Sequence, residues 1–349
     1  MRLADRIAQC LTPLVVQNTK DGSLTHLNDA AAFAKDIEKC PTRYVLSDEL
    51  TRLCTALAYS KGARTLACTD LLHVPAQRVW IEWTEAPWRN ELALYGFRNA
   101  SDPVSSGRRG IFIQSNHEGR RGLMRTFWTG GDSEFEVRAS SMEAYFDFDA
   151  QEGDPVAFDQ QDRPSFGVSD NAVGKADILR RCFRFQFERS WQDYYDGGRL
   201  TAMQTAAVSH HALGGIAIDI PVVLAFFLLL STRPNLPRRP LMLERLNRAR
   251  SKSGKARLLD QIEVFSPLLP EYRPSNDSSS GISRRAARLH HVRGHLVRRG
   301  SEIFWRVPHL RGRARSGVIH TRTVTWTIDA PERKRGAARA AEVATAHIV

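Results

Sequence analysis

Residues 212–230 read ALGGIAIDIPVVLAFFLLL, and the way this stretch is used decides the fold of the chain. It is nearly long enough to cross a bilayer, but Asp219, Pro221 and two glycines interrupt it. The uninterrupted run over 221–230 has a length typical of a buried core helix rather than a membrane span. Asp219 two residues before Pro221 also indicates a helix start, with the aspartate as its cap. We therefore expect a buried helix over 221–231 and no membrane partner.

The sequence before and after this helix predicts a mixture of helices and strands. Caps at Asn28 or Asp29 and at Ser47 each precede a helix-like stretch. Glycines separate the apolar stretches of the middle region, which favours antiparallel connections. We expect strands at 78–83, 111–114, 123–128, 134–138, 145–148 and 261–265, and helices at 176–196 and just after residue 240.

The C-terminal part differs from the rest in composition. The Ser-, Pro- and Asn-rich stretch over 271–283 is typical of a linker, and strand-like segments follow at 287–298, 302–307 and 317–328. The prediction is an α+β protein: an N-terminal mixed α/β unit with a buried apolar helix, and a small C-terminal antiparallel β module. The expected boundaries are 1–275 for the α/β domain, 284–328 for the Arg/His-rich β module and 329–349 for a charged tail.

The chain carries a formal net charge of +12 at pH 7, and most of this charge lies near the C-terminus. Residues 281–326 contain eleven arginines, no lysine and one acidic residue, Glu302. Such a local basic block indicates a polyanionic partner, because guanidinium groups pair with phosphate or carboxylate. The five cysteines have no CxxC spacing, which predicts buried thiols in a cytoplasmic protein and argues against a structural metal.

The same basic block concentrates histidine and tryptophan among its arginines. On a strand over 290–297, His291, Arg293 and His295 would share one face. Arginine contacts phosphate and aromatic side chains stack on bases, so nucleic acid is the favoured partner. A basic loop with Lys252, Lys255 and Arg257 extends the surface. We expect the binding residues to be His290, His291, Arg293, Gly294, His295, Arg298, Trp305, Arg306, His309, Arg311, Gly312 and Arg313.

Three other uses of these residues stay open. The arginines are compatible with an acidic protein surface, and the whole segment is compatible with a purely structural module. His291, His295 and His309 are compatible with a ribonuclease, with or without a metal. However, no neighbouring carboxylate orients these histidines, and the chain lacks the P-loop, GxGxxG, HExxH and GxSxG motifs. The sequence therefore favours a protein that is not an enzyme, with no cofactor and no metal.

The run His290-His291-Val292-Arg293-Gly294-His295, followed by an aromatic- and arginine-rich strand, resembles the C-terminal signature of the large type V-A anti-CRISPR family and its phage relatives. In that family a His-x-x-Arg-Gly-His core lies between a proline and a tryptophan. Here Leu289 and Leu296 occupy those flanking places. The stretch PHLRG over 308–312 is similar to a second element of the phage relatives.

This resemblance implies a protein of a phage or another mobile element that inhibits host defence. The family suppresses the type V-A effector nuclease by acting on its production. The implied partner is RNA or a translating complex, with a CRISPR effector protein as a further one. The sequence-based hypothesis is thus a regulator that lowers the production of a target nuclease through a basic C-terminal surface.

Overall fold

The structure is a computed structural model, and the chain divides into two compact units. One unit consists of Met1–Leu268 with Leu296–Trp305, and the other of Leu269–His295 with Arg306–Val349. The structure describes residues 2–9, 14–16, 25–26, 30–59, 69–97, 107–129, 137–150, 165–166, 177–189, 202–231, 236–266, 288–292, 295–299, 302–306, 309–311 and 313–318. The expected tail over 329–349 lies outside these residues.

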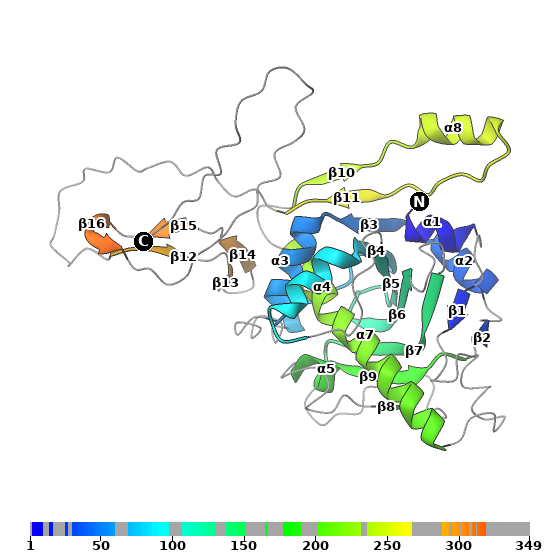
Figure 1. The fold of residues 1–349 in the computed structure, drawn as a ribbon, viewed down its shortest axis with the longest axis horizontal. Coiled ribbons are helices and arrows are strands. Elements are labelled where there is room, and N and C mark those ends of the chain that lie inside the picture. The colour runs from blue at the N-terminus through cyan, green and yellow to red at the C-terminus, as the bar shows by residue number, and fades with distance from the viewer. Residues whose placement is uncertain are drawn as a thin grey trace. The chain divides into compact units, whose positions relative to one another are not determined.

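The first unit is built on a mixed sheet of eleven strands (Figure 1). The strands are β1 (Leu14–Val16), β2 (Thr25–His26), β3 (Thr42–Leu46), β4 (Arg78–Thr84), β5 (Arg108–Ser115), β6 (Arg121–Thr129), β7 (Val137–Asp147), β8 (Ser165–Phe166), β9 (Phe183–Phe187), β10 (Arg238–Pro240) and β11 (Ile262–Val264). Their order is β10-β11-β3-β4-β5-β6-β7-β1-β2, with β9 beside β7 and β8 beside β9. The pairs β3–β4, β11–β3 and β1–β7 are parallel, and the other pairs in this sheet are antiparallel.

Helices cover both faces of the sheet. They are α1 (Leu3–Ala8), α2 (Ala30–Glu38), α3 (Asp48–Tyr59), α4 (Glu85–Ala93), α5 (Asp177–Cys182) and α7 (Ala202–Leu230). A further helix, α8 (Glu244–Lys252), lies beyond the sheet edge, between β10 and β11. Alternate residues of β4 point to opposite faces. On one face Glu82 accepts hydrogen bonds from the first backbone N–H groups of α1. On the other face Arg109 of β5, the partner of Trp83, meets Trp88 of α4 and Asp219 of α7.

Helix α7 is the apolar helix that the sequence predicts, but it is longer than expected. It has 29 residues and contains Pro221 in its interior (Figure 1). The prediction that Asp219 caps the helix is therefore wrong. The small and apolar residues before Asp219 continue the helix, and Asp219 pairs with Arg109 instead of capping. The expected burial is confirmed, because the side chains from Val222 to Leu229 are at most 1% exposed.

The part of α7 over Ala212–Leu230 is long and apolar enough to cross a membrane. In this structure 72% of its apolar window is buried by the rest of the protein. Phe226 makes an edge-to-face contact with Tyr44 of β3, and Tyr59 of α3 donates a hydrogen bond of 2.6 Å to the Ile218 carbonyl. The helix thus packs as the centre of a core on this face of the sheet.

Three predicted elements of the first unit are corrected by the structure. The helix expected over 176–196 ends at Cys182 and is followed by strand β9, because Phe183, Phe185 and Phe187 alternate and are all buried. The strands expected at 134–138 and 145–148 are parts of one strand, β7. Helix α4 was not predicted. The α+β class itself is confirmed.

The C-terminal strands form two small sheets. Strand β12 (Arg288–Val292) pairs with β15 (His309–Arg311) and β16 (Arg313–Val318), and β13 (His295–Arg299) pairs with β14 (Glu302–Arg306). The β12–β15 pair is antiparallel, as expected, but β12 and β16 are parallel. A parallel pair needs a long crossover, and the chain between β12 and β16 supplies one.

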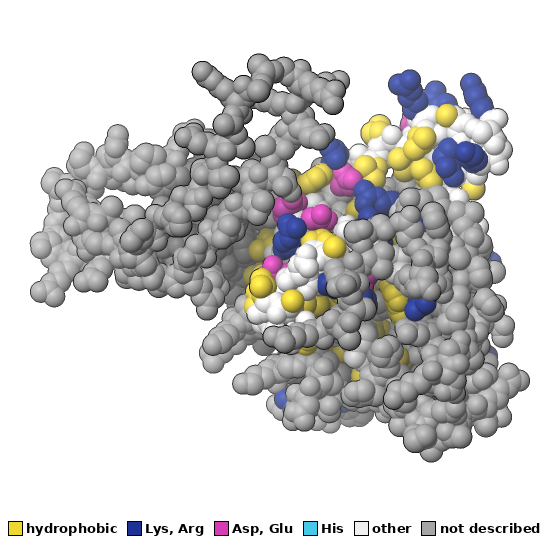
Figure 2. Space-filling view, in the orientation of Figure 1, with side chains coloured by type: hydrophobic (Ala, Val, Ile, Leu, Met, Phe, Trp, Pro, Cys, Tyr) yellow, Lys and Arg dark blue, Asp and Glu magenta, His cyan; other side chains and the backbone are white. Residues whose placement is uncertain are grey.

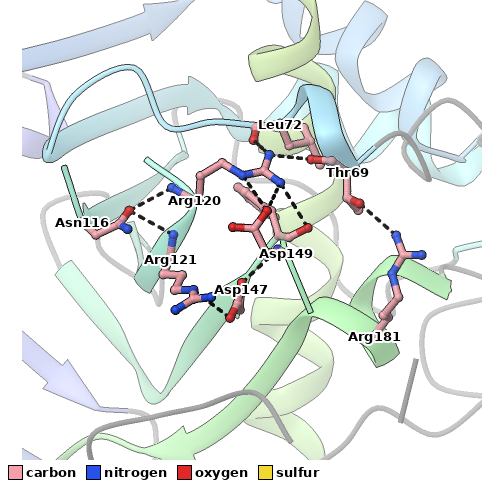
Figure 3. Close-up of polar contacts among 9 residues, drawn as sticks. Thr69, Leu72, Asn116, Arg120, Arg121, Asp147, Asp149 and Arg181 are labelled. Atoms are coloured by element: carbon pink, nitrogen blue, oxygen red, sulfur yellow. Dashed lines mark hydrogen bonds and ion pairs between the residues drawn. The ribbon is translucent and has the colours of Figure 1, made fainter. Parts of the chain in front are cut away.

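Arg120 joins the β5–β6 turn to two distant segments of the chain (Figure 3). Its Nη1 donates to the carbonyl oxygens of Thr69 at 2.8 Å and Leu72 at 2.6 Å, and its Nε donates to Asp149 at 3.0 Å. The next residue, Arg121, forms an ion pair of 2.9 Å with Asp147. Charge-assisted bonds of this kind hold the turn against the end of β7.

The turn also needs glycine at position 119, and we predict a large effect of Gly119→Ala on stability. Gly119 has a φ of +70°, and an added Cβ would lie 2.8 Å from the Val74 nitrogen and closer still to its carbonyl oxygen. We expect a loss of about 3 kcal/mol in urea-induced unfolding. Gly254→Ala is the matched control, because its φ is +67° but its Cβ would meet nothing within 4 Å. It should cost about 1 kcal/mol, and equal losses for the two variants would contradict the argument.

Candidate functional site

The predicted C-terminal binding residues are distributed over both small sheets. His290 and His291 lie on β12, and His309 and Arg311 lie on β15. The backbone register pairs His290 with Arg311 and Val292 with His309. Arg313 begins β16, where it pairs with Arg288 of β12. The structure therefore brings these histidines and arginines together in one three-stranded sheet.

The remaining predicted residues are not part of that sheet. The strand expected over 290–297 is wrong, because the chain forms β12 up to Val292 and the separate strand β13 from His295. His295 and Arg298 lie on β13, and Trp305 and Arg306 lie on β14. The sequence has a glycine between these two strands, and glycine weakens strand interiors. Arg293, Gly294 and Gly312 lie outside the described residues.

A second basic surface lies on the edge of the large sheet. We call residues 236–266 the basic arm; it consists of β10, α8, β11 and their connections (Figure 1). Its cations are exposed, except for the half-buried Arg250, and Figure 2 shows their side chains gathered around α8. Three acidic residues, Glu244, Asp260 and Glu263, accompany them. The cations are Arg238, Arg239, Arg245, Arg248, Arg250, Lys252, Lys255 and Arg257.

The arm keeps its shape through a few polar contacts. The side chain of Asn247 on α8 accepts a hydrogen bond from the Leu258 nitrogen at 2.8 Å and donates one to the Leu258 carbonyl at 3.0 Å. Arg250 donates to the Ala256 carbonyl at 2.8 Å. Gly254 has a positive φ and lets the chain turn between them. The cations are thus carried by a defined helix-and-turn structure.

The return segment of the arm is joined to the N-terminal helix. Asp5 of α1 accepts a hydrogen bond of 2.7 Å from the Leu259 nitrogen, and Gln9 donates one of 3.1 Å to the Arg257 carbonyl. Arg2 forms an ion pair of 2.9 Å with Glu263. Burial raises the pKa of Asp5 above its ordinary value. We call these contacts the N-terminal junction.

Two buried carboxylates, Glu82 and Asp219, form polar clusters in the core of the first unit. Burial alone would raise the pKa of Glu82, but Arg108 and the backbone N–H groups of Leu3 and Ala4 lower it. Asp219 accepts two hydrogen bonds from Arg109 on one oxygen, while its other oxygen has no partner among the described residues. Burial raises the pKa of Asp219 to about 6 despite the attraction of Arg109.

The sequence did not predict that either carboxylate belongs to a buried polar cluster. Glu82 was predicted only to lie in a strand, and Asp219 was predicted to cap a helix. Their partners lie far away in the chain, since Arg109 and Asp219 are 110 positions apart.

A pocket with a volume of about 770 Å³ lies against the basic arm. Arg250, Lys255 and Arg257 of the arm line it, together with Arg43 and Glu38. Arg43 is already engaged, because it donates to the carbonyl oxygens of Ile37, Glu38 and Asp260. The positive charge of this pocket therefore comes mainly from Arg250, Lys255 and Arg257 of the arm.

Among the described residues, no group of His, Cys, Asp and Glu is arranged to hold a metal ion. Cys40, Cys54 and Cys182 are free and buried, and burial raises the pKa of each thiol. These cysteines are therefore poor nucleophiles. The chain matches no family model, no curated protein and no solved structure.

Proposed function

We propose that this protein is a regulator that binds RNA through the basic arm and the C-terminal arginine- and histidine-rich strands, and that it does so without cleaving the RNA. The observation that carries the proposal is the basic arm itself, with eight cations and three acidic residues in one edge structure. Arg245, Lys252, Lys255 and Arg257 form no ion pair with any described residue, which leaves them available for phosphate. Phosphate contacts of this kind supply most of the affinity of non-specific RNA binding.

The residue types of the C-terminal strands support the same proposal. The backbone register pairs His290 with Arg311 in one sheet, and Arg306 of the other sheet is exposed. The resemblance of residues 290–295 to the type V-A anti-CRISPR signature extends the proposal to a mobile-element protein of the cytoplasm. In this extension, binding to RNA or a translating complex lowers the production of a target nuclease and so inhibits host defence.

A second candidate function is an adaptor that binds an acidic protein surface. The basic arm exposes two large apolar side chains among its cations, Met242 at 81% and Leu246 at 48%. Exposed apolar residues within a charged surface are typical of protein interfaces. Binding to RNA itself separates the two functions, because the regulator needs phosphate contacts, which release counterions in proportion to their number, whereas the adaptor needs an acidic protein.

We predict that binding to single-stranded RNA falls steeply with salt and that the basic arm carries a measurable part of the slope. Lys252→Gln combined with Lys255→Gln should flatten the slope of log affinity against log salt by about 1.4, at about 0.7 per phosphate contact. Fluorescence anisotropy with labelled RNA between about 50 and 200 mM salt measures this slope.

The matched control replaces two exposed cations outside the arm, Lys35 of α2 and Arg52 of α3, by glutamine. This control should leave the slope unchanged. The same incubation, with and without a chelator, tests for a ribonuclease. RNA cleavage that His295→Ala abolishes and Arg313→Ala does not would replace the regulator by an enzyme. RNA binding that is insensitive to salt would contradict the phosphate contacts.

A further inference from the structure

A smaller pocket lies where the basic arm meets the N-terminal helix. Its volume is about 290 Å³, which is at the low end of the range for small-molecule pockets, about 300–1,000 Å³. Three leucines of the arm provide apolar walls, and α1, β5 and the start of β11 provide the polar groups. The lining residues are Arg2, Asp5, Arg108, Leu241, Leu243, Leu258 and Gln261.

The side-chain amide of Gln261 has no partner in this pocket. Gln261 is 3% exposed, and neither its oxygen nor its nitrogen makes a hydrogen bond with a described residue. The Nη2 of Arg108 is also buried without a partner among these residues. A buried polar group without a hydrogen bond is unfavourable, so a ligand that supplies both a donor and an acceptor would be favoured here.

The charges of the pocket exclude a simple anion site. Arg108 is paired with Glu82, and Arg2 is paired with Glu263. Asp5 adds a further carboxyl group to the lining. The groups left over are therefore a neutral amide, one guanidinium N–H and three leucine side chains. They suit a flat, neutral, mostly apolar group whose edge presents a donor beside an acceptor.

We propose that this pocket binds one unpaired adenine base of the RNA, an inference that rests on the RNA-binding function proposed above. Glutamine pairs with adenine through two hydrogen bonds, in which its oxygen accepts from the N6 amino group and its nitrogen donates to N7. Apolar side chains pack on the faces of bases held outside a stack. Arg245, Lys252 and Lys255 of the same arm are exposed and available to the phosphates that accompany such a base.

The first test leaves the protein unchanged and alters the RNA. Wild-type protein is titrated with an oligouridine of about ten nucleotides that carries one central adenine. In two further oligonucleotides this adenine is replaced by purine, which lacks the 6-amino group, or by an abasic site. We expect affinity to fall by about tenfold for purine and by more for the abasic site, at constant salt. Equal affinity for the three oligonucleotides would overturn the adenine pocket.

The second test compares Gln261→Leu with Gln114→Leu, a matched change at an exposed position of β5. Gln261→Leu should abolish the preference for adenine over purine, whereas Gln114→Leu should keep it. The salt slope should be the same in both variants, because neither change removes a cation. If Gln261→Leu fails to fold, the three oligonucleotides with wild-type protein still decide the question.

Two further measurements identify the source of the base and test for a protein partner. Adenosine monophosphate that raises the melting temperature of the wild type, but not of Gln261→Leu, assigns the same pocket to a free nucleotide. Binding of an oligoglutamate peptide that depends on Gln261, without any adenine effect, would overturn the proposal in favour of a protein partner. Salt-dependent RNA binding with no adenine preference would remove the pocket and leave the proposed function intact. If the protein bound none of these RNAs, both the adenine pocket and the proposed function would be contradicted.

Discussion

Glu82→Ala should destabilise the first unit by about 4 kcal/mol, measured by urea-induced unfolding. The carboxylate is fully buried and accepts hydrogen bonds from the nitrogens of Leu3 at 2.9 Å and Ala4 at 3.1 Å. It also accepts one from the indole of Trp80 at 3.2 Å and pairs with Arg108. Its removal leaves a buried guanidinium and several N–H groups without partners.

Two variants make this prediction specific. Glu82→Gln keeps an acceptor oxygen but loses the charge, so we expect a smaller loss, of about 2 kcal/mol. Glu244→Ala removes a carboxylate that is exposed on α8 and lies 3.7 Å from Arg248, and it should change stability by less than about 0.5 kcal/mol. A loss below about 1 kcal/mol for Glu82→Ala would show that the cluster does not stabilise the fold.

The stability of the wild type relative to Asp219→Asn should decrease by up to about 3 kcal/mol between about pH 4 and pH 6. The pKa of Asp219 in the folded protein is about 6, because burial disfavours the carboxylate. A raised pKa means that the folded state holds this proton more tightly than the unfolded state. The resulting stability is present below about pH 4 and is lost as the pH rises to about 6.

Urea-induced unfolding at several pH values, with both proteins under the same conditions, measures this difference. The control replaces the ion-pair partner of Asp219. Arg109→Met should lower the free energy of unfolding by about 3–5 kcal/mol in the wild type at neutral pH, and by less in the Asp219→Asn background. A flat difference between wild type and Asp219→Asn across this pH range would contradict the raised pKa.

Local patterns predicted those elements whose sequence signal is also local. The alternation and apolar content over 78–83, 111–114 and 123–128 predicted the central strands, and Ser47 predicted the start of α3, where its hydroxyl accepts from the Leu50 nitrogen. The apolar run predicted the burial of α7. Strand β9 was missed because its aromatic content suggested a helix, although Phe183, Phe185 and Phe187 already show the two-residue period.

The clusters and pockets depend on pairings that no local pattern contains. Asp219 looks like a cap beside Pro221 until Arg109 is placed against it by the sheet. Gln261 stands in an ordinary strand start, and only the packing of α1 against the arm buries its amide. The basic loop with Lys252 and Lys255 and the short helix before it were predicted from the sequence, but their place between the edge strands β10 and β11 required the structure.

The N-terminal junction determines the order in which the chain can assemble during its synthesis. Asp5 and Arg2 contact residues 259 and 263, so the first helix finds its partners 254 and 261 residues later in the chain. Helix α1 leaves the ribosome early but cannot complete these contacts until the return segment of the arm has followed. Contacts with such a sequence separation form slowly. The nascent chain therefore stays open at this edge until residues 259–263 have been synthesised, and only then can the arm close onto α1.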